Sequence, residues 1–323
     1  MGNFSLFLLA TLVSQAATVS EYELLKRFPP LLLQGIGAGG RPDGEGLVGA
    51  NRGHWYEAGM QRGGMWTLIA AADDAWRAVG ATFARQLDDG GFASNPTPDA
   101  TRPPDLAGRA QTAFFFLQEL AHALLVLRES PLAPHFTGRI AALEPKLRRA
   151  AAFASADFDT LIRNNRKAAN RILIAAKAFA FCGVLLDDEP LRTAARRLIG
   201  VALEQRDPAT GAFLENGGLD SSYNAVSLLF AEVILLHFPH AELAAALPAA
   251  MKWQGTRIQS TGEVSAEGNS RTGVSKETYL GHPKNVNYSE VALALAFLGL
   301  AYDEPETFAL ADRVFAFGHR PRR

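Results

Sequence analysis

Hydrophobic residues recur along most of the chain at every third or fourth position, the spacing of one face of a helix. No stretch of comparable length alternates between apolar and polar residues as a half-buried strand does. The chain is therefore predicted to be all-α. Helices are expected over 57–71, 73–87, 107–128, 136–154, 167–186, 190–205, 222–237, 240–252, 288–301 and 305–317.

The predicted helices come in pairs. The first member of most pairs is apolar nearly all round, as in TAFFFLQELAHALLVL, which predicts burial on every side. The second member is amphipathic, as in EPLRTAARRLIGVALEQ, which predicts a place on the outside. The inner helices are expected at 57–71, 107–128, 167–186, 222–237 and 288–301.

A weak repeat follows three of the outer helices. RQLDDGGF, EQRDPATGAF and RIQSTGEV each place Gln before a turn rich in Gly or Asp, with an apolar residue after it. A repeated helix pair with its turn predicts an array of stacked neighbours. We expect one domain over 1–323, an (α/α) toroid of five to six helical hairpins, with an open solenoid as the alternative. A short β-hairpin or a long loop is expected near 255–284.

Composition narrows the possible functions. The 323 residues carry a formal net charge of −1 and are 48% hydrophobic, which is typical of a globular protein. No basic stripe with interleaved aromatic residues appears, so we expect no nucleic-acid partner. The only cysteine, Cys182, lies in an apolar run, which predicts a buried, inert thiol and excludes a cysteine-based zinc site. We expect no metal and no cofactor.

The N-terminal segment 1–17 has two interpretations. Its apolar core followed by Ala16 and Ala17 is typical of a signal peptide, although a basic start is missing. In that case the protein is periplasmic or secreted. If 1–17 is instead an ordinary first helix, the protein is cytoplasmic. No other segment reaches the roughly 20 apolar residues that a membrane-spanning helix needs, so no membrane span is expected.

Polar residues gather where the inner helices are expected to begin. In a toroid these ends line the mouth of one funnel, so similar clusters at successive starts predict a shared ligand cleft. The candidate residues are His54, Trp55, Tyr56, Gln61, Arg62, Asn164, Asn165, Arg166, Asp220, Tyr223, His282, Lys284, Asn285, Asn287 and Tyr288. Trp55, Tyr56 and Tyr288 can stack on the apolar faces of sugar rings.

Two of these clusters resemble a known family. Asn164-Asn165-Arg166 before an Ala/Leu-rich run is similar to the Asn-Asn-His motif of the α/α-toroid polysaccharide lyases of the alginate-lyase and heparinase II/III kind. ENGGLDSSYNAVSLLF resembles their Ser-x-Tyr segment, with Tyr223 in the Tyr position. Arg166 replaces the His of that family, which puts the usual assignment of base and acid in doubt. The resemblance implies a polysaccharide lyase that acts on a uronate-containing polysaccharide or oligosaccharide.

Such a lyase removes a weakly acidic proton from the carbon next to a carboxylate. Amide and guanidinium donors spread the charge of that carboxylate and lower the barrier, and Asn165 and Arg166 are the predicted donors. Tyr223, with His54 or Tyr288, is predicted to transfer the protons. Whether Tyr223 donates or takes a proton, its working pKa is expected well below the usual value of about 10, and Arg166 is the cation expected to stabilise its phenolate. The remaining candidates are predicted to bind the sugar chain.

Two other functions remain open. A glycoside hydrolase on the same fold needs two carboxylates, for which Asp220 and one of Glu57, Glu215 or Glu277 are candidates. A non-enzymatic, glycan-binding repeat protein needs neither the proton-transfer residues of a lyase nor the paired carboxylates of a hydrolase. Asn164 and Asn165 can also be ordinary capping residues, and Tyr223 can be a packed wall residue.

The histidines outside these clusters are not predicted to be functional residues. His122, inside an apolar helix, is expected to be a satisfied core residue, and its partner for a metal site on a second helix is missing from the pattern. His237, His240 and His319 fall at predicted helix ends and are expected at the surface.

Overall fold

The chain is mostly helical, as the apolar spacing predicts. The computed structural model describes residues 20–28, 32, 42–48, 58–62, 72–94, 104–273, 277–279, 281–301 and 304–320. Its helices are α2 (Glu21–Leu25), the 3-10 helix η2 (Ala58–Arg62), α5 (Ala72–Phe83), α6 (Leu106–Glu129), α7 (Ala133–Ser155), α8 (Phe158–Asn165), α9 (Ala169–Leu185), α10 (Glu189–Glu204), α11 (Ser221–His237), α12 (Ala241–Thr256), α13 (Tyr288–Ala301) and α14 (Pro305–Gly318).

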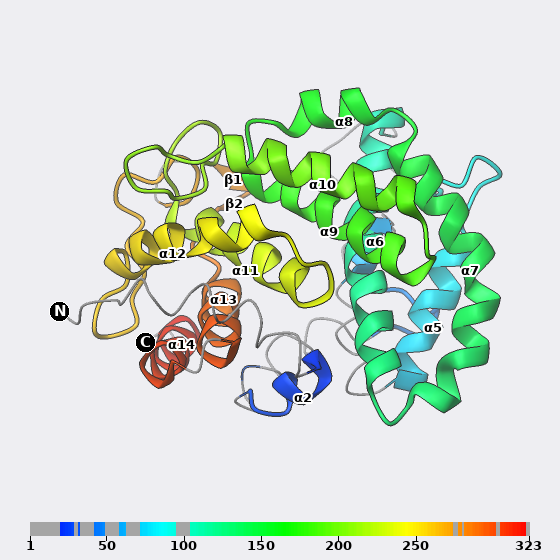
Figure 1. The fold of residues 1–323 in the computed structure, drawn as a ribbon, viewed down its shortest axis with the longest axis horizontal. Coiled ribbons are helices and arrows are strands. Elements are labelled where there is room, and N and C mark those ends of the chain that lie inside the picture. The colour runs from blue at the N-terminus through cyan, green and yellow to red at the C-terminus, as the bar shows by residue number, and fades with distance from the viewer. Residues whose placement is uncertain are drawn as a thin grey trace.

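Four apolar helices form the core. α6 packs on α9, α9 on α11 and α11 on α13, and they follow one another from right to left in Figure 1. α9 buries every residue except Arg171 and Val184, as its all-round apolarity predicts. The prediction of buried inner helices is therefore confirmed for these four. The fifth, 57–71, is described only as far as η2, and the rest of it lies outside the described residues.

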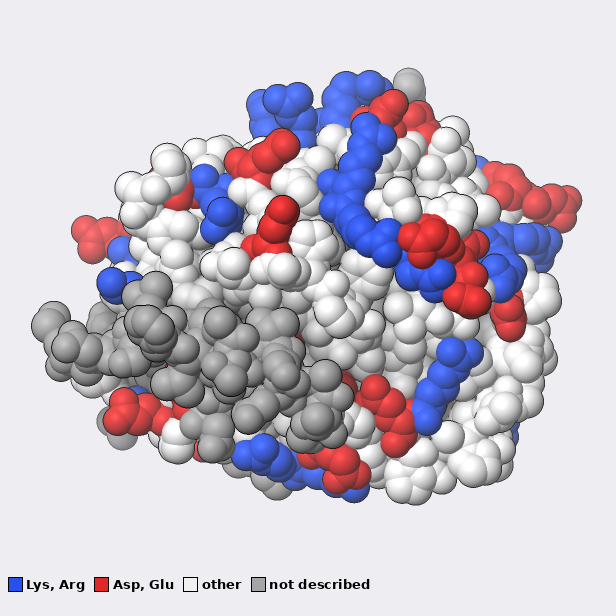
Figure 2. All heavy atoms as spheres, in the orientation of Figure 1, with Lys and Arg blue, Asp and Glu red and all other residues white. Residues whose placement is uncertain are grey.

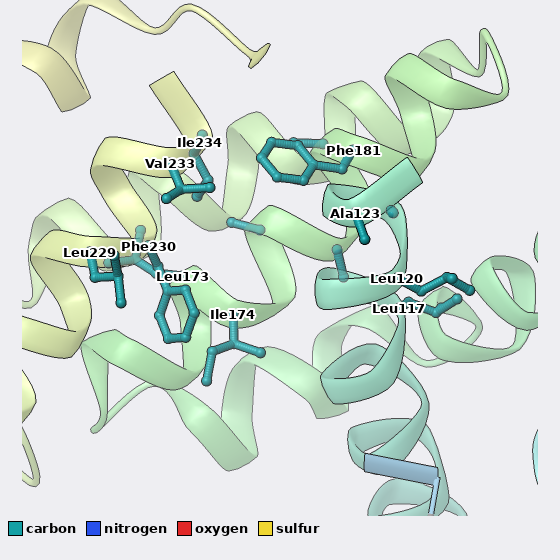
Figure 3. Close-up of a cluster of buried hydrophobic side chains, with 14 of the residues drawn as sticks. Leu117, Leu120, Ala123, Leu173, Ile174, Phe181, Leu229, Phe230, Val233 and Ile234 are labelled. Atoms are coloured by element: carbon teal, nitrogen blue, oxygen red, sulfur yellow. The ribbon is translucent and has the colours of Figure 1, made fainter. Parts of the chain in front are cut away.

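Side chains from three of these helices meet in one cluster. Figure 3 shows Leu117 and Leu120 of α6, Leu173 and Phe181 of α9, and Phe230 of α11 in this cluster. Each fully buried Leu or Phe side chain contributes about 1.5–3 kcal/mol to stability. Cys182 is buried in the same layer, and burial raises the pKa of its thiol to about 12, so the prediction of an inert core thiol is confirmed.

The outer helices each contact the inner helix that precedes them. α7 packs on α6, α10 on α9, α12 on α11 and α14 on α13. In α10 the buried residues are Leu191, Ala195, Leu198, Ile199 and Ala202, which recur every three or four positions and cover one face. The predicted amphipathic character of this helix is confirmed by that pattern.

The repeated turn after the outer helices is present in all three predicted places. Isolated bridges join Gln86 to Phe92, Arg206 to Phe213 and Ile258 to Val264. Inside the turns, Gly90, Gly211 and Gly262 all have positive φ.

The glycines of these turns also explain how one outer helix meets the next. A Cβ at Gly90 would collide with the carbonyl of Arg149 on α7, and one at Gly262 with the carbonyl of Arg313 on α14. Only glycine accepts both the left-handed conformation and this close approach. The turn therefore fixes each outer helix against its successor.

The segment before α9 differs from the prediction. Asn164 and Asn165 end the short helix α8, which was not expected, and α9 begins only at Ala169. The side chain of Asp157 accepts a hydrogen bond from the backbone N–H of Thr160 and starts α8. Asn164 and Asn165 therefore do not open an inner helix. The N-cap position of α9 is Ala168, which has no side-chain cap.

The region near 255–284 contains a hairpin, as expected. β1 (Thr278–Tyr279) and β2 (His282–Pro283) pair antiparallel, with Thr278 opposite Pro283. The chain around them connects α12 to α13 and passes the beginning of α11. This path brings the loop to the polar residues described below.

One described helix, α6, is long and apolar enough to cross a membrane. Within the protein, 78% of its most apolar window is buried, and a core helix of this length passes the same test of length and composition.

Candidate active site

Asp220 holds the beginning of α11 against the loop that precedes the hairpin. Its Oδ1 accepts hydrogen bonds from the backbone N–H groups of Ser222 (3.0 Å) and Tyr223 (3.1 Å). Its Oδ2 accepts from the backbone N–H groups of Arg271 (2.9 Å) and Thr272 (2.8 Å), and the Thr272 hydroxyl donates to Oδ1 at 2.9 Å. The side chain is fully buried. Asp220 therefore has a structural role, and neither predicted role, in substrate binding or as a hydrolase carboxylate, fits this geometry.

The loop segment fixed by Asp220 carries a guanidinium into a network of charges. Arg271 forms a salt bridge with the buried Glu215 through Nη1. Its Nε and Nη2 donate to Glu277 at 2.9–3.0 Å, and Lys284 Nζ lies 2.6 Å from the same carboxylate. The hydrogen bonds from Arg271 and Lys284 lower the pKa of Glu277 to about 2. Two segments more than 50 residues apart in the sequence thus form one cluster.

Tyr223 lies against this network and is half-buried. The Arg271 guanidinium is 4.6 Å from the centre of its ring, and Lys284 Nζ is 6.0 Å from it. Burial raises the pKa of Tyr223 to about 12, although Arg271 acts in the opposite direction. The expected depression of this pKa by Arg166 is therefore wrong for the protein without substrate. The nearby cation is Arg271, and the phenol stays protonated at neutral pH.

The turn between α8 and α9 runs beside Glu215. Ala168 forms a bridge with Glu215, and the backbone N–H of Asn216 donates to the carbonyl of Lys167 at 2.6 Å. The sequence stretches around residues 165 and 215 therefore lie together, as the shared-cleft prediction requires. Burial raises the pKa of Glu215, while Arg271 and Arg171 act against this rise.

Three cations lie on this turn and in the first turn of α9. Arg166 and Lys167 are exposed and Arg171 is half-buried, and no hydrogen bond or ion pair joins their side chains to another described residue. Figure 2 shows Lys and Arg side chains gathered at the edge of the molecule where α8 lies. We call Arg166, Lys167 and Arg171 the cationic turn.

Asn164 and Asn165 face a different place from Tyr223. Both line a cavity of about 360 Å³ between the start of α6, the end of α7 and α8, together with Asp105 and Gln111. Asn165 donates from Nδ2 to the carbonyl of Leu161 at 2.9 Å, and its buried Oδ1 has no hydrogen-bond partner among the described residues. The prediction that Asn165 shares one surface with Tyr223 is not supported, because the two side chains have separate surroundings.

Tyr288 belongs to the packing of the last helix. Its ring lies 5.4 Å from that of Phe317 on α14, and its hydroxyl is close to the backbone N–H of Val264. Burial raises the pKa of Tyr288. This environment does not place it with Tyr223 as a second proton-transfer group.

The other predicted residues fall into three groups. Gln61 is buried and exchanges two hydrogen bonds of 2.8 Å with the backbone of Val48, so its role is structural rather than substrate-binding. Asn287 accepts from the backbone N–H of Glu290 at 3.3 Å in the first turn of α13, while His282 and Asn285 are exposed near the hairpin. The side chain of Arg62 and all of His54, Trp55, Tyr56 and Glu57 lie outside the described residues.

The sequence marks Arg271 only as one of several charged residues in the loop 261–284, a candidate flap over the cleft, and does not predict that it organises the cluster. Its loop has no helical pattern, and the sequence carries no signal that links it to Asp220. In comparisons with family models, curated proteins and solved structures, the chain matches none of them.

Proposed function

We propose that this protein is a carbohydrate-active enzyme that cleaves a uronate-containing polysaccharide or oligosaccharide by β-elimination. The observation that supports the proposal is the set of charged residues around the Tyr223 side chain. A half-buried phenol with Arg271 over its ring lies beside Glu215, which the cationic turn adjoins. Each uronate of a polymer carries one carboxylate, and the unpaired cations of the cationic turn attract such a polyanion.

In this reaction the proton on C5 of the uronate leaves, the C4–O bond breaks, and a C4=C5 double bond forms. The leaving oxygen takes up a proton. Tyr223 supplies it, because its raised pKa keeps the phenol protonated across the physiological range. His54 is the proposed acceptor of the C5 proton, since a histidine is the ordinary base near neutral pH.

The cationic turn holds the acidic sugars in this scheme. Exposed Lys and Arg side chains attract a polyanion over roughly one Debye length, about 8 Å at physiological ionic strength. Lys284 and Arg271 are already paired with Glu277, so they contribute less to binding than the unpaired Arg166, Lys167 and Arg171.

The geometry favours elimination over hydrolysis. A hydrolase needs two carboxylates that reach the scissile bond. Asp220 is fully occupied by hydrogen bonds, Glu215 is buried, and Glu277 is paired with two cations. None of these three described candidates is free to act as the nucleophile or the acid.

We also propose that the helix pairs close into an (α/α) toroid. The succession of the inner helices α6, α9, α11 and α13 and the recurring turn support it. In this architecture the starts of the inner helices, where Tyr223 lies, line the mouth of the funnel.

The direct test is turnover of uronate polymers by Tyr223→Phe. This variant keeps the ring and removes the hydroxyl, so the midpoint of thermal unfolding should change little. Turnover should fall by roughly 10²–10⁴, the usual contribution of a positioned acid or base. Tyr288→Phe is the matched control and should stay close to wild type. Turnover by Tyr223→Phe equal to that of the control contradicts the proposed role.

A further inference from the structure

Three potential metal ligands from three distant segments meet at the other end of α11. Glu21 comes from α2, His122 from α6 and His237 from the last turn of α11. The Nε2 atoms of both histidines lie 2.7 Å from the Glu21 carboxylate. Within this group, the atoms that could bind an ion all lie within 4.8 Å of one another. His237 was expected at the surface, but its side chain is only 6% exposed.

Each imidazole also has a second carboxylate on its opposite nitrogen. His122 Nδ1 lies 3.5 Å from Glu119, and His237 Nδ1 lies 3.5 Å from Glu129. Histidines that bind metals usually donate their other N–H to a carboxylate, which fixes the tautomer and orients the ring. An ordinary core histidine needs only one such partner.

The net charge of the cluster is suited to a divalent cation. Glu21, Glu119 and Glu129 bring three negative charges, and Lys177, 3.2 Å from Glu119, brings one positive charge. With both imidazoles neutral, as metal ligands must be, two negative charges remain. A divalent ion balances them in a place where uncompensated charge is costly.

One aromatic side chain lies against both histidines, and the cluster is buried. The ring of Phe181 lies 5.5 Å from that of His122 and 5.3 Å from that of His237. Glu21 has no exposed side-chain surface, and His122 is 2% exposed. Burial that excludes water in this way strengthens the attraction between an ion and its ligands.

We propose that Glu21, His122 and His237 bind one divalent transition-metal ion, with Glu119 and Glu129 orienting the two histidines. Two imidazoles and one carboxylate suit Zn²⁺ and other first-row metals rather than Mg²⁺ or Ca²⁺. Metal–ligand bonds of about 2.0–2.2 Å hold the ligand atoms of a tetrahedral site about 3.3–3.6 Å apart, so each 2.7 Å pair of Glu21 and histidine atoms must separate by roughly 0.6–0.9 Å. The ion joins α2 to α6 and α11. This proposal differs from the sequence prediction of no metal and does not depend on the proposed function.

The test measures zinc bound to the untagged full chain. Protein produced with added Zn²⁺ and then dialysed should retain one zinc per chain by elemental mass spectrometry. Co²⁺ in place of zinc should give visible absorption bands. His237→Gln should lose the ion, and the midpoint of thermal unfolding of the wild type should rise with added Zn²⁺ while that of the variant does not.

Two further variants keep the test decisive if His237→Gln folds poorly. Glu129 is 29% exposed, so Glu129→Gln should fold, and it should bind zinc about 10–100-fold more weakly. His319→Gln, at an exposed position, is the matched control and should bind like wild type. Wild-type protein that retains no zinc, or Glu129→Gln that binds as tightly as His319→Gln, overturns the proposal.

Discussion

The two ends of α11 contain similar residue types arranged for different purposes. At the beginning, Tyr223 is half-buried, and Arg166 and Lys167, on the turn beside Glu215, are exposed and unpaired among the described residues. At the end, about 25 Å away by the rise of a 17-residue helix, His237 joins Glu21 and His122 in a closed cluster.

The difference lies in access rather than in composition. Carboxylates, cations and a ring that carries a proton occur at both ends. A group that must meet a substrate has to keep part of its surface exposed, whereas a group that joins segments gains from complete burial. We therefore expect changes at the beginning of α11 to affect turnover and changes at its end to affect stability.

The largest expected loss of stability follows from Lys177→Met, near the closed end. The variant leaves the carboxylate of Glu119 buried without its ammonium partner, which costs about 3–5 kcal/mol. Lys177 is 1% exposed, so water cannot replace the lost partner. Denaturant unfolding measures the loss, and the double variant Lys177→Met/Glu119→Gln should recover much of it. No recovery would mean that the loss comes from packing alone.

Asp220→Ala should cost a similar amount, about 4 kcal/mol, because four backbone N–H donors lose their acceptor and each unsatisfied group costs at least about 1 kcal/mol. Stability falls because the loop that carries Arg271 loses its hydrogen bonds to Asp220. Asp220→Asn keeps one acceptor oxygen and should lose less stability, with turnover far closer to wild type than that of Tyr223→Phe. A stable but inactive Asp220→Asn would favour a hydrolase. Thermal unfolding and turnover are measured on the same preparations.

Reversing two charges of the cationic turn should weaken binding without changing the chemical step. Arg166→Glu/Lys167→Glu is expected to raise KM for a uronate polymer roughly tenfold, since each exposed charge contact is worth up to about 1 kcal/mol. The increase should shrink at high salt. Lys252→Glu on α12 is the control, because it reverses one exposed charge on an outer helix. An equal increase in the control would show a nonspecific effect of net charge.

The smallest effect concerns the titration of Tyr223. A folded-state pKa of about 12 against about 10 in the unfolded chain favours the folded state below pH 10, and this contribution is lost as the pH rises from 10 to 12. The difference in phenolate absorbance between wild type and Tyr223→Phe should therefore develop above pH 10. Development below pH 10 would show a lowered pKa and would make Tyr223 a candidate base instead.

The fold could largely be predicted from the sequence. Helix pairs follow from apolar spacing, and the buried or one-sided character of each helix follows from its pattern, as α9 and α10 show. The recurring turn could be predicted because glycine and the preceding Gln mark it. The start of α9 could not, because Asp157 begins an extra helix that places Asn164 and Asn165 at a helix end.

The candidate site was predictable only in part. Tyr223 could be predicted as a candidate because it lies in the first turn of an apolar helix after a polar segment. Arg271 was noted only as one of several charged residues in the loop 261–284. Its central place was not predicted, because it depends on hydrogen bonds from the backbone of Arg271 and Thr272 to Asp220, which no local pattern encodes. The partner of His122 and His237 was missed for the same reason, since Glu21 lies 101 residues before His122.

The most direct test of the central claim is the chemical nature of the products formed from a uronate polymer. The account predicts one new carbon–carbon double bond, detected by ultraviolet absorbance, for each new reducing end. It also predicts no cleavage of a neutral polymer of the same backbone, which gives the cationic turn nothing to bind. New reducing ends without double bonds would contradict β-elimination and make the protein a hydrolase. No cleavage of any uronate polymer would contradict the proposed enzyme altogether.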